Sequence, residues 1–88
     1  MSVQAIAWAF EQTVRGGAKL VLLALANRAD YENSCFPSIA RLTKEAGISR
    51  RSVAYALREL VKLGLVSRER RRRSGGTQTS NLYLLHIV

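Results

Sequence analysis

Arginine and lysine side chains are concentrated in one part of this 88-residue sequence. Between Arg41 and Arg73 there are eleven basic and three acidic residues, so this stretch accounts for the whole net charge of +8. A clustered excess of positive charge is the electrostatic pattern of a surface that binds a polyanion, because guanidinium and ammonium groups pair with phosphates. The sequence therefore favours nucleic acid as the partner.

Those basic residues fall largely on two predicted helices that are joined by a tight turn. Ser38 and Ser49 each precede a run with helical spacing, and a serine hydroxyl at that place can cap the free N–H groups of the first turn. Gly47 and Gly64 follow the two runs, and glycine tolerates the left-handed backbone that ends a helix. The pattern predicts a helix-turn-helix over residues 38–64. The positions expected to face its core are Ile39, Leu42, Thr43, Ala46, Val53, Ala56, Leu57, Leu60 and Val61.

The second helix of this pair carries a basic face on the side opposite its apolar residues. The major groove of B-DNA admits one α-helix, whose first turns reach base edges while later residues meet phosphates. We therefore expect base contacts from Arg51, Ser52 and Tyr55. Arg58 should reach a base or a phosphate, and Lys62 should reach the backbone. The full set of residues that we expect at DNA is Ser38, Ser49, Arg50, Arg51, Ser52, Tyr55, Arg58, Lys62, Arg70, Arg71, Arg72 and Arg73.

An arginine run, Arg70–Arg73, stands at the tip of a predicted β-hairpin. Residues 65–70 and 82–88 have strand-like patterns, and Ser74-Gly75-Gly76 supplies a flexible turn between them. The run should lie on phosphates beside the duplex, or insert one arginine into a narrow minor groove. An ordinary solvated surface is the alternative interpretation of all these cations. So much like charge on one surface would destabilise an isolated protein, which favours the nucleic-acid interpretation.

The remaining segments should support this surface. Residues 1–14 fit a short helix or an extended arm, in which Trp8 is a core anchor or a dimer contact. Residues 18–30 are rich in Leu and Ala and should form the central, best-buried helix. Because Pro37 disfavours a helical conformation at the residue before it, Phe36 should be extended, as a short third strand.

These elements predict one domain, residues 1–88, that is mainly α with a small β-sheet. The architecture is a winged helix-turn-helix, with a three-helix core and a C-terminal β-hairpin wing over residues 65–88. One face of the last strand should close the core. The two faces are Tyr83, Leu85 and Ile87, and Leu82, Leu84 and His86. The chain is expected to be either a very small protein or the N-terminal domain of a longer one.

Several classes of protein are disfavoured by what the sequence lacks. Cys35 is the single cysteine and His86 the single histidine, so the chain can form no internal disulfide and has no metal-ligand cluster at a recognised spacing. No motif of a nucleophile with an activating base is present in the sequence either. We expect Cys35 to be a half-buried thiol and His86 to be structural or exposed. The longest apolar run, Leu20–Ala26, is far below the ~20 residues of a membrane span. We expect no enzymatic activity, cofactor, small-molecule substrate or membrane partner, and a cytoplasmic location in a bacterial or phage-infected host cell.

A family resemblance covers residues 17–85. Its most specific marks are Phe36-Pro37-Ser38, Ser49-Arg50-Arg51-Ser52-Val53, Leu60 with Gly64-Leu65-Val66, and Thr79-Ser80-Asn81-Leu82-Tyr83. With them the chain resembles the winged helix-turn-helix domain of bacteriophage and plasmid replication initiators of the lambda O type. The middle portion is also similar to MarR-type regulators, in which an arginine often stands at the position of Tyr55. The resemblance implies sequence-specific binding of duplex DNA, often as a dimer on repeated or inverted sites.

Three functions are compatible with these observations. The first is DNA binding at an origin of phage or plasmid replication, and the second is a small transcriptional repressor with the same DNA chemistry. The third is a protein-docking module, because some winged helices bind proteins through the same surface. The residues do not distinguish the first two, and they leave the target sequence and the presence of a homodimer on DNA open.

Overall fold

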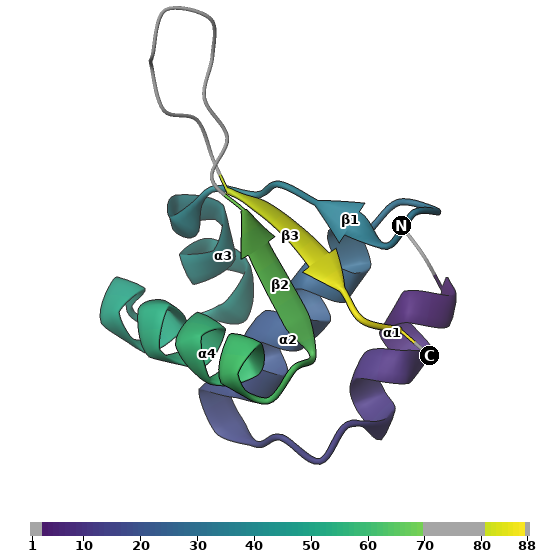
Figure 1. The fold of residues 1–88 in the computed structure, drawn as a ribbon. Helices are drawn as coiled ribbons and strands as arrows, with labels where there is room; N and C mark the ends of the chain where they lie inside the picture. The colour runs from purple at the N-terminus through teal and green to yellow at the C-terminus, as the bar shows by residue number, and fades with distance from the viewer. Residues whose placement is uncertain (1–2, 70–80, 88) are drawn as a thin grey trace, which may run out of the picture.

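Four helices and a small antiparallel sheet make up the described part of the chain, residues 3–69 and 81–87 of a computed structural model (Figure 1). The tip predicted at Ser74–Gly76 lies outside these residues. The order of elements is α1 (Val3–Glu11), α2 (Gly16–Arg28), β1 (Ser34–Cys35), α3 (Ile39–Ala46), α4 (Arg50–Lys62), β2 (Val66–Glu69) and β3 (Leu82–Leu85).

The central helix of the core is α2. Its Leu and Ala residues are strong helix formers, and Val21, Leu22 and Leu25 are completely buried. It packs against α1, α3, α4 and the sheet, with α3 and α4 on one side and α1 on the other in Figure 1. The surface that α4 presents is therefore supported from behind by the best-buried element of the fold.

The predicted bounds of this helix, 18–30, are wrong by two residues at each end. The helix ends at Arg28 because Asp30 forms a turn instead: its carboxylate accepts hydrogen bonds from the backbone N–H groups of Glu32 at 2.9 Å and Ser34 at 3.1 Å. These bonds also hold the pKa of Asp30 below its ordinary value. At the other end the helix takes in Gly16, whose φ of 59° lies in the left-handed region.

The N-terminal segment is a helix, one of its two predicted forms. Trp8 is only 8% exposed and belongs to the core, which confirms the core-anchor interpretation. The C-terminal end of α1 is tied to α2 by Lys19, whose Nζ donates to the carbonyl oxygens of Phe10 at 2.6 Å and Gln12 at 2.7 Å. A lysine at this place satisfies carbonyl groups that have no partner within the helix.

The helix-turn-helix has the predicted caps. Ser38 precedes α3, and Gly47 ends it with a φ of 72°. Ser49 precedes α4, and Gly64 follows it with a φ of 78°. Val61 was predicted to face the core, and this is wrong, because its side chain is 38% exposed. At 3.6 residues per turn Val61 lies about 80° around the helix from the buried face, at the edge of the apolar stripe.

The sheet has the strand order β1-β3-β2, with both pairs antiparallel. The third strand is Ser34–Cys35 and not Phe36, which follows it and is 59% exposed. In β1–β3 pairing, Ser34 lies opposite Leu84 and Cys35 opposite Tyr83. The wing strands begin at Val66 and end at Leu85, within their predicted ranges.

The inward face of β3 is the one that carries Tyr83 and Leu85, both buried, while His86 is exposed. Cys35 is 4% exposed, so the expectation of a half-buried thiol is wrong. Its Sγ donates to the Leu25 carbonyl oxygen at 3.5 Å, and burial raises the pKa of the thiol to about 12. A thiol in this state is part of the packing and is not a nucleophile.

Candidate nucleic-acid interface

The outward face of α4 carries the exposed side chains of Arg51, Tyr55, Arg58 and Lys62. The opposite face of the same helix carries Val53, Leu57 and Leu60, which are completely buried, together with Ala56 at 5% exposure. Packing against α2, α3 and β2 fixes the helix from three directions. The division of α4 into a buried and a charged face is the one expected from its helical periodicity.

Three further predicted residues form the start of α4. Ser49 is the N-cap: its hydroxyl oxygen accepts a hydrogen bond from the Ser52 backbone N–H at 3.1 Å, and its O–H donates to Ser52 Oγ at 3.0 Å. Arg50 is the first helical residue and is exposed. The exposed Ser52 hydroxyl still has a proton to donate to a ligand, because it acts as the acceptor in this pair.

The remaining predicted residue of the helix pair, Ser38, lies at the start of α3. Its hydroxyl oxygen accepts from the Arg41 backbone N–H at 3.1 Å, so it acts as a cap here too. The other end of α3 is joined to α2 by an ion pair in which Arg28 donates two hydrogen bonds from Nε and one from a terminal nitrogen to Glu45. This bonding lowers the pKa of Glu45 and raises that of Arg28.

Tyr55 lies between two arginine side chains. The Cζ atom of Arg51 is 5.9 Å from the centre of the tyrosine ring, and that of Arg58 is 5.6 Å from it. Both distances are within the range of a cation–π contact. All three residues were predicted at the DNA surface, but the contact between them was not predicted. Their spacing in the sequence could have predicted it, because residues four before and three after a given position lie beside it on a helix.

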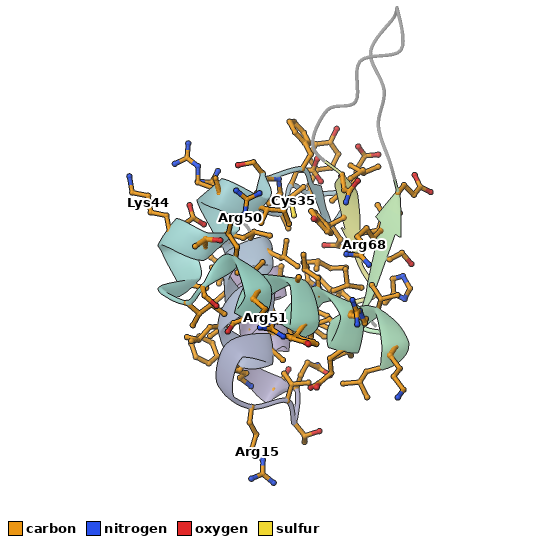
Figure 2. All side chains as sticks on the ribbon, turned by 90° about the vertical axis from the view of Figure 1, so that its left-hand side faces the viewer. Arg15, Cys35, Lys44, Arg50, Arg51 and Arg68 are labelled. Atoms are coloured by element: carbon orange, nitrogen blue, oxygen red, sulfur yellow. The ribbon has the colours of Figure 1, made fainter. Side chains whose placement is uncertain are left out.

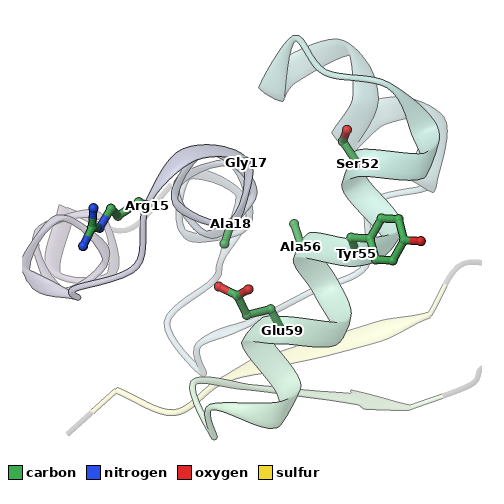
Figure 3. Close-up of a pocket in the computed structure, with 7 residues that line it drawn as sticks. All are labelled: Arg15, Gly17, Ala18, Ser52, Tyr55, Ala56 and Glu59. Atoms are coloured by element: carbon green, nitrogen blue, oxygen red, sulfur yellow. The ribbon is translucent and has the colours of Figure 1, made fainter.

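A hollow of about 280 Å³ lies between α4 and the beginning of α2, and Figure 3 shows the residues that line it. Arg15 borders it and adds a cation that the sequence analysis did not assign to the surface. In Figure 3 its side chain points away from α4, while Glu59 points toward the start of α2. A carboxylate near a helix N-terminus is favourable for the helix dipole, and it makes the hollow a poor phosphate site.

The basic surface extends from the helix pair to the wing. Figure 2 shows Lys44 on α3, Arg50 and Arg51 on α4, and Arg68 on β2 distributed across one side of the molecule. Arg68 lies opposite the buried Tyr83 in the β2–β3 register and is itself exposed. The predicted contacts of Arg70–Arg73 lie outside the described residues. The structure thus brings the α4 residues together with Lys44 and Arg68 on a single positive surface.

Within residues 3–69 and 81–87, no group of three or more histidine, cysteine, aspartate or glutamate side chains could hold a metal ion. Among the same residues, no helix has the length and apolar character needed to cross a membrane.

The helical core, the helix-turn-helix of α3 and α4, and the antiparallel β2–β3 pair define a winged-helix domain. The sequence profile of the helix-turn-helix domain family matches residues 15–66, so the chain belongs to this family. Membership suggests DNA as the partner. No curated protein and no solved structure matches the chain.

Proposed function

We propose that this chain binds double-stranded DNA in a sequence-dependent manner, with α4 in the major groove. The observation that carries the proposal is the outward face of α4, where Arg51, Arg58 and Lys62 are exposed on a helix whose opposite face is buried. Arg28–Glu45 is the only ion pair formed among the described residues, so the α4 cations are free to meet phosphates or bases. The proposal includes binding alone, with no reaction catalysed.

Within the wider domain, each group of residues has its own role in this proposal. Arg51, Ser52 and Tyr55 face base edges, while Lys62 meets the backbone. Ser38 and Arg50 lie at helix starts, where free N–H groups and the helix dipole favour a phosphate. The arginine run Arg70–Arg73 contributes affinity that does not depend on base sequence.

The biological setting that we propose is recognition of an origin in phage or plasmid replication, in the cytoplasm of a bacterial host. The support for it is the resemblance of residues 17–85 to initiators of that kind, whose domains often act as dimers on repeated or inverted sites. A transcriptional repressor would use the same DNA chemistry. The arrangement of the target sites is what separates these settings.

Selection of bound sequences from a random duplex pool tests the proposal. We expect enrichment of a short motif in a few rounds, since helix-turn-helix contacts in one major groove cover only a few base pairs. Direct repeats of that motif in a replicon would support origin recognition, whereas an inverted repeat would support binding as a homodimer. Failure to enrich any sequence would contradict sequence-dependent binding and favour a protein-docking role.

A further inference from the structure

We propose that Tyr55 is a positioning residue that holds Arg51 and Arg58 in place to read two guanines in the major groove. This inference rests on the proposed DNA binding and adds the identity of the bases. It also gives Tyr55 a different role from the direct base contact that its position on α4 suggests.

The geometry begins with the position of the ring. Tyr55 is 55% exposed, so its ring stands out from α4 and is not held by the core. Figure 3 shows its hydroxyl directed outward, away from the hollow beside α2. Arg51 lies one turn before the ring and Arg58 one turn after it, with Cζ-to-centroid distances of 5.9 and 5.6 Å. Both guanidinium groups therefore lie close to the same aromatic ring.

Stacking and hydrogen bonding use different parts of a guanidinium group. A cation–π contact uses the positive charge of the guanidinium group, while its N–H donors lie in the plane of the group and can still bond a base. Neither arginine pairs with a carboxylate among the described residues. An arginine held beside the ring is thus restricted in rotation but keeps the two adjacent donors that match O6 and N7 of guanine, the commonest specific contact in the major groove.

The shared ring also limits how far apart the two bases can be. Each Cζ atom lies within about 6 Å of the same centroid, so the two guanidinium groups are at most about 12 Å apart. One base-pair step rises about 3.4 Å. The two guanines should therefore lie within about four base pairs of each other, on either strand.

The test compares the wild type with Tyr55→Phe and Tyr55→Leu. Phenylalanine keeps the aromatic face, and leucine removes it without changing the charge. Tyr31→Leu is the matched control, because Tyr31 is 92% exposed in the turn after α2 and lies outside the proposed interface. Each protein binds the selected duplex and a copy in which the guanines are replaced by 7-deazaguanine, which lacks the N7 acceptor. Circular dichroism verifies that each variant is folded.

We expect the wild type, Tyr55→Phe and Tyr31→Leu to prefer guanine over 7-deazaguanine by the same factor, within about twofold. In Tyr55→Leu the preference for guanine over 7-deazaguanine should be about twofold to fivefold smaller at each of the two guanines, since each arginine loses one exposed cation–π contact. Its salt dependence should be unchanged because no cation is lost. A selective loss of preference with an unchanged salt dependence is a result that general destabilisation of the domain would not produce.

Three results would overturn the inference. If Tyr55→Leu keeps the full guanine preference, the arginines position themselves without the ring. The second result is a selected motif that lacks two guanines within about four base pairs of each other, while binding stays strong and salt-dependent. In that case Arg51 and Arg58 contact phosphates, and the proposed DNA binding stands without this inference. If no duplex is bound at all, the proposed function fails together with it.

Discussion

Replacement of Ser49 by alanine removes the cap of the helix that is proposed to enter DNA. The Ser49 hydroxyl oxygen accepts from the Ser52 backbone N–H at 3.1 Å, and its O–H donates to Ser52 Oγ at 3.0 Å. Loss of a serine cap costs about 0.5–2 kcal/mol of unfolding free energy. Because Ser49 is exposed, water can reach the freed N–H group, so we expect about 0.5–1 kcal/mol. For a domain of this size that lowers Tm by about 2–8 °C.

Thermal and urea unfolding measure this loss of unfolding free energy. Both are followed by the fluorescence of Trp8, the single tryptophan, which lies in the core. Ser49→Gly should cost only a few tenths of a kcal/mol, and Ser49→Asp should retain the cap and gain from the helix dipole. The aspartate variant should nevertheless bind DNA more weakly, because it places a negative charge at the interface. Equal stability of the alanine variant and the wild type, or equal destabilisation by alanine and glycine, would refute the capping argument.

Three more predictions concern the elements that support the surface. Gly47→Ala should lower the unfolding free energy by about 1–2 kcal/mol in urea titrations, because the φ of 72° strains an L-residue although no atom lies near the added Cβ; an unchanged midpoint would contradict this. Cys35, with a pKa of about 12, should react with iodoacetamide at pH 8 about a thousandfold more slowly in the native state than in denaturant. Because the pKa of this thiol is higher in the folded than in the unfolded state, its contribution to the unfolding free energy is complete below about pH 8 and is lost as pH rises toward 12. Rapid alkylation of the native protein would contradict the buried, protonated state of the thiol on which both predictions rest. Glu45→Gln should destabilise the domain slightly at pH 7 by breaking the pair with Arg28. Because the pKa of Glu45 is lowered in the folded state, the difference between this variant and the wild type should begin to shrink below about pH 4.3, the ordinary value of a glutamate, and should vanish once the folded carboxylate is protonated. A difference that persists in acid would argue against the ion pair.

Features that depend on neighbouring residues were predictable from the sequence. Ser38, Ser49 and Gly47 act on the backbone within three or four residues, so the residue type and its place in the apolar pattern were enough to place the caps. The buried and exposed faces of α4 follow from the same helical period. This is why the sequence could place Arg51, Tyr55, Arg58 and Lys62 on the exposed face of α4.

Features that depend on distant residues were not predictable in this way. The strand at Ser34–Cys35 exists because β3, some fifty residues later, pairs with it. The end of α2 is set by the carboxylate of Asp30, which competes with the helix for backbone N–H groups. Arg15 comes to border α4 only through the packing of α2 against that helix, and no residue next to it in the sequence indicates this.

The salt dependence of binding to duplex DNA tests the central claim most directly. The basic surface should neutralise about five to eight phosphates, so the logarithm of the binding constant should fall linearly with the logarithm of salt concentration, with a slope of about −5 to −7. Lys62→Gln should make that slope less steep by about 0.9, the value for one phosphate contact. A flat salt response, or no binding to duplex DNA at low salt, would contradict the claim that α4 and the wing form a DNA-binding surface.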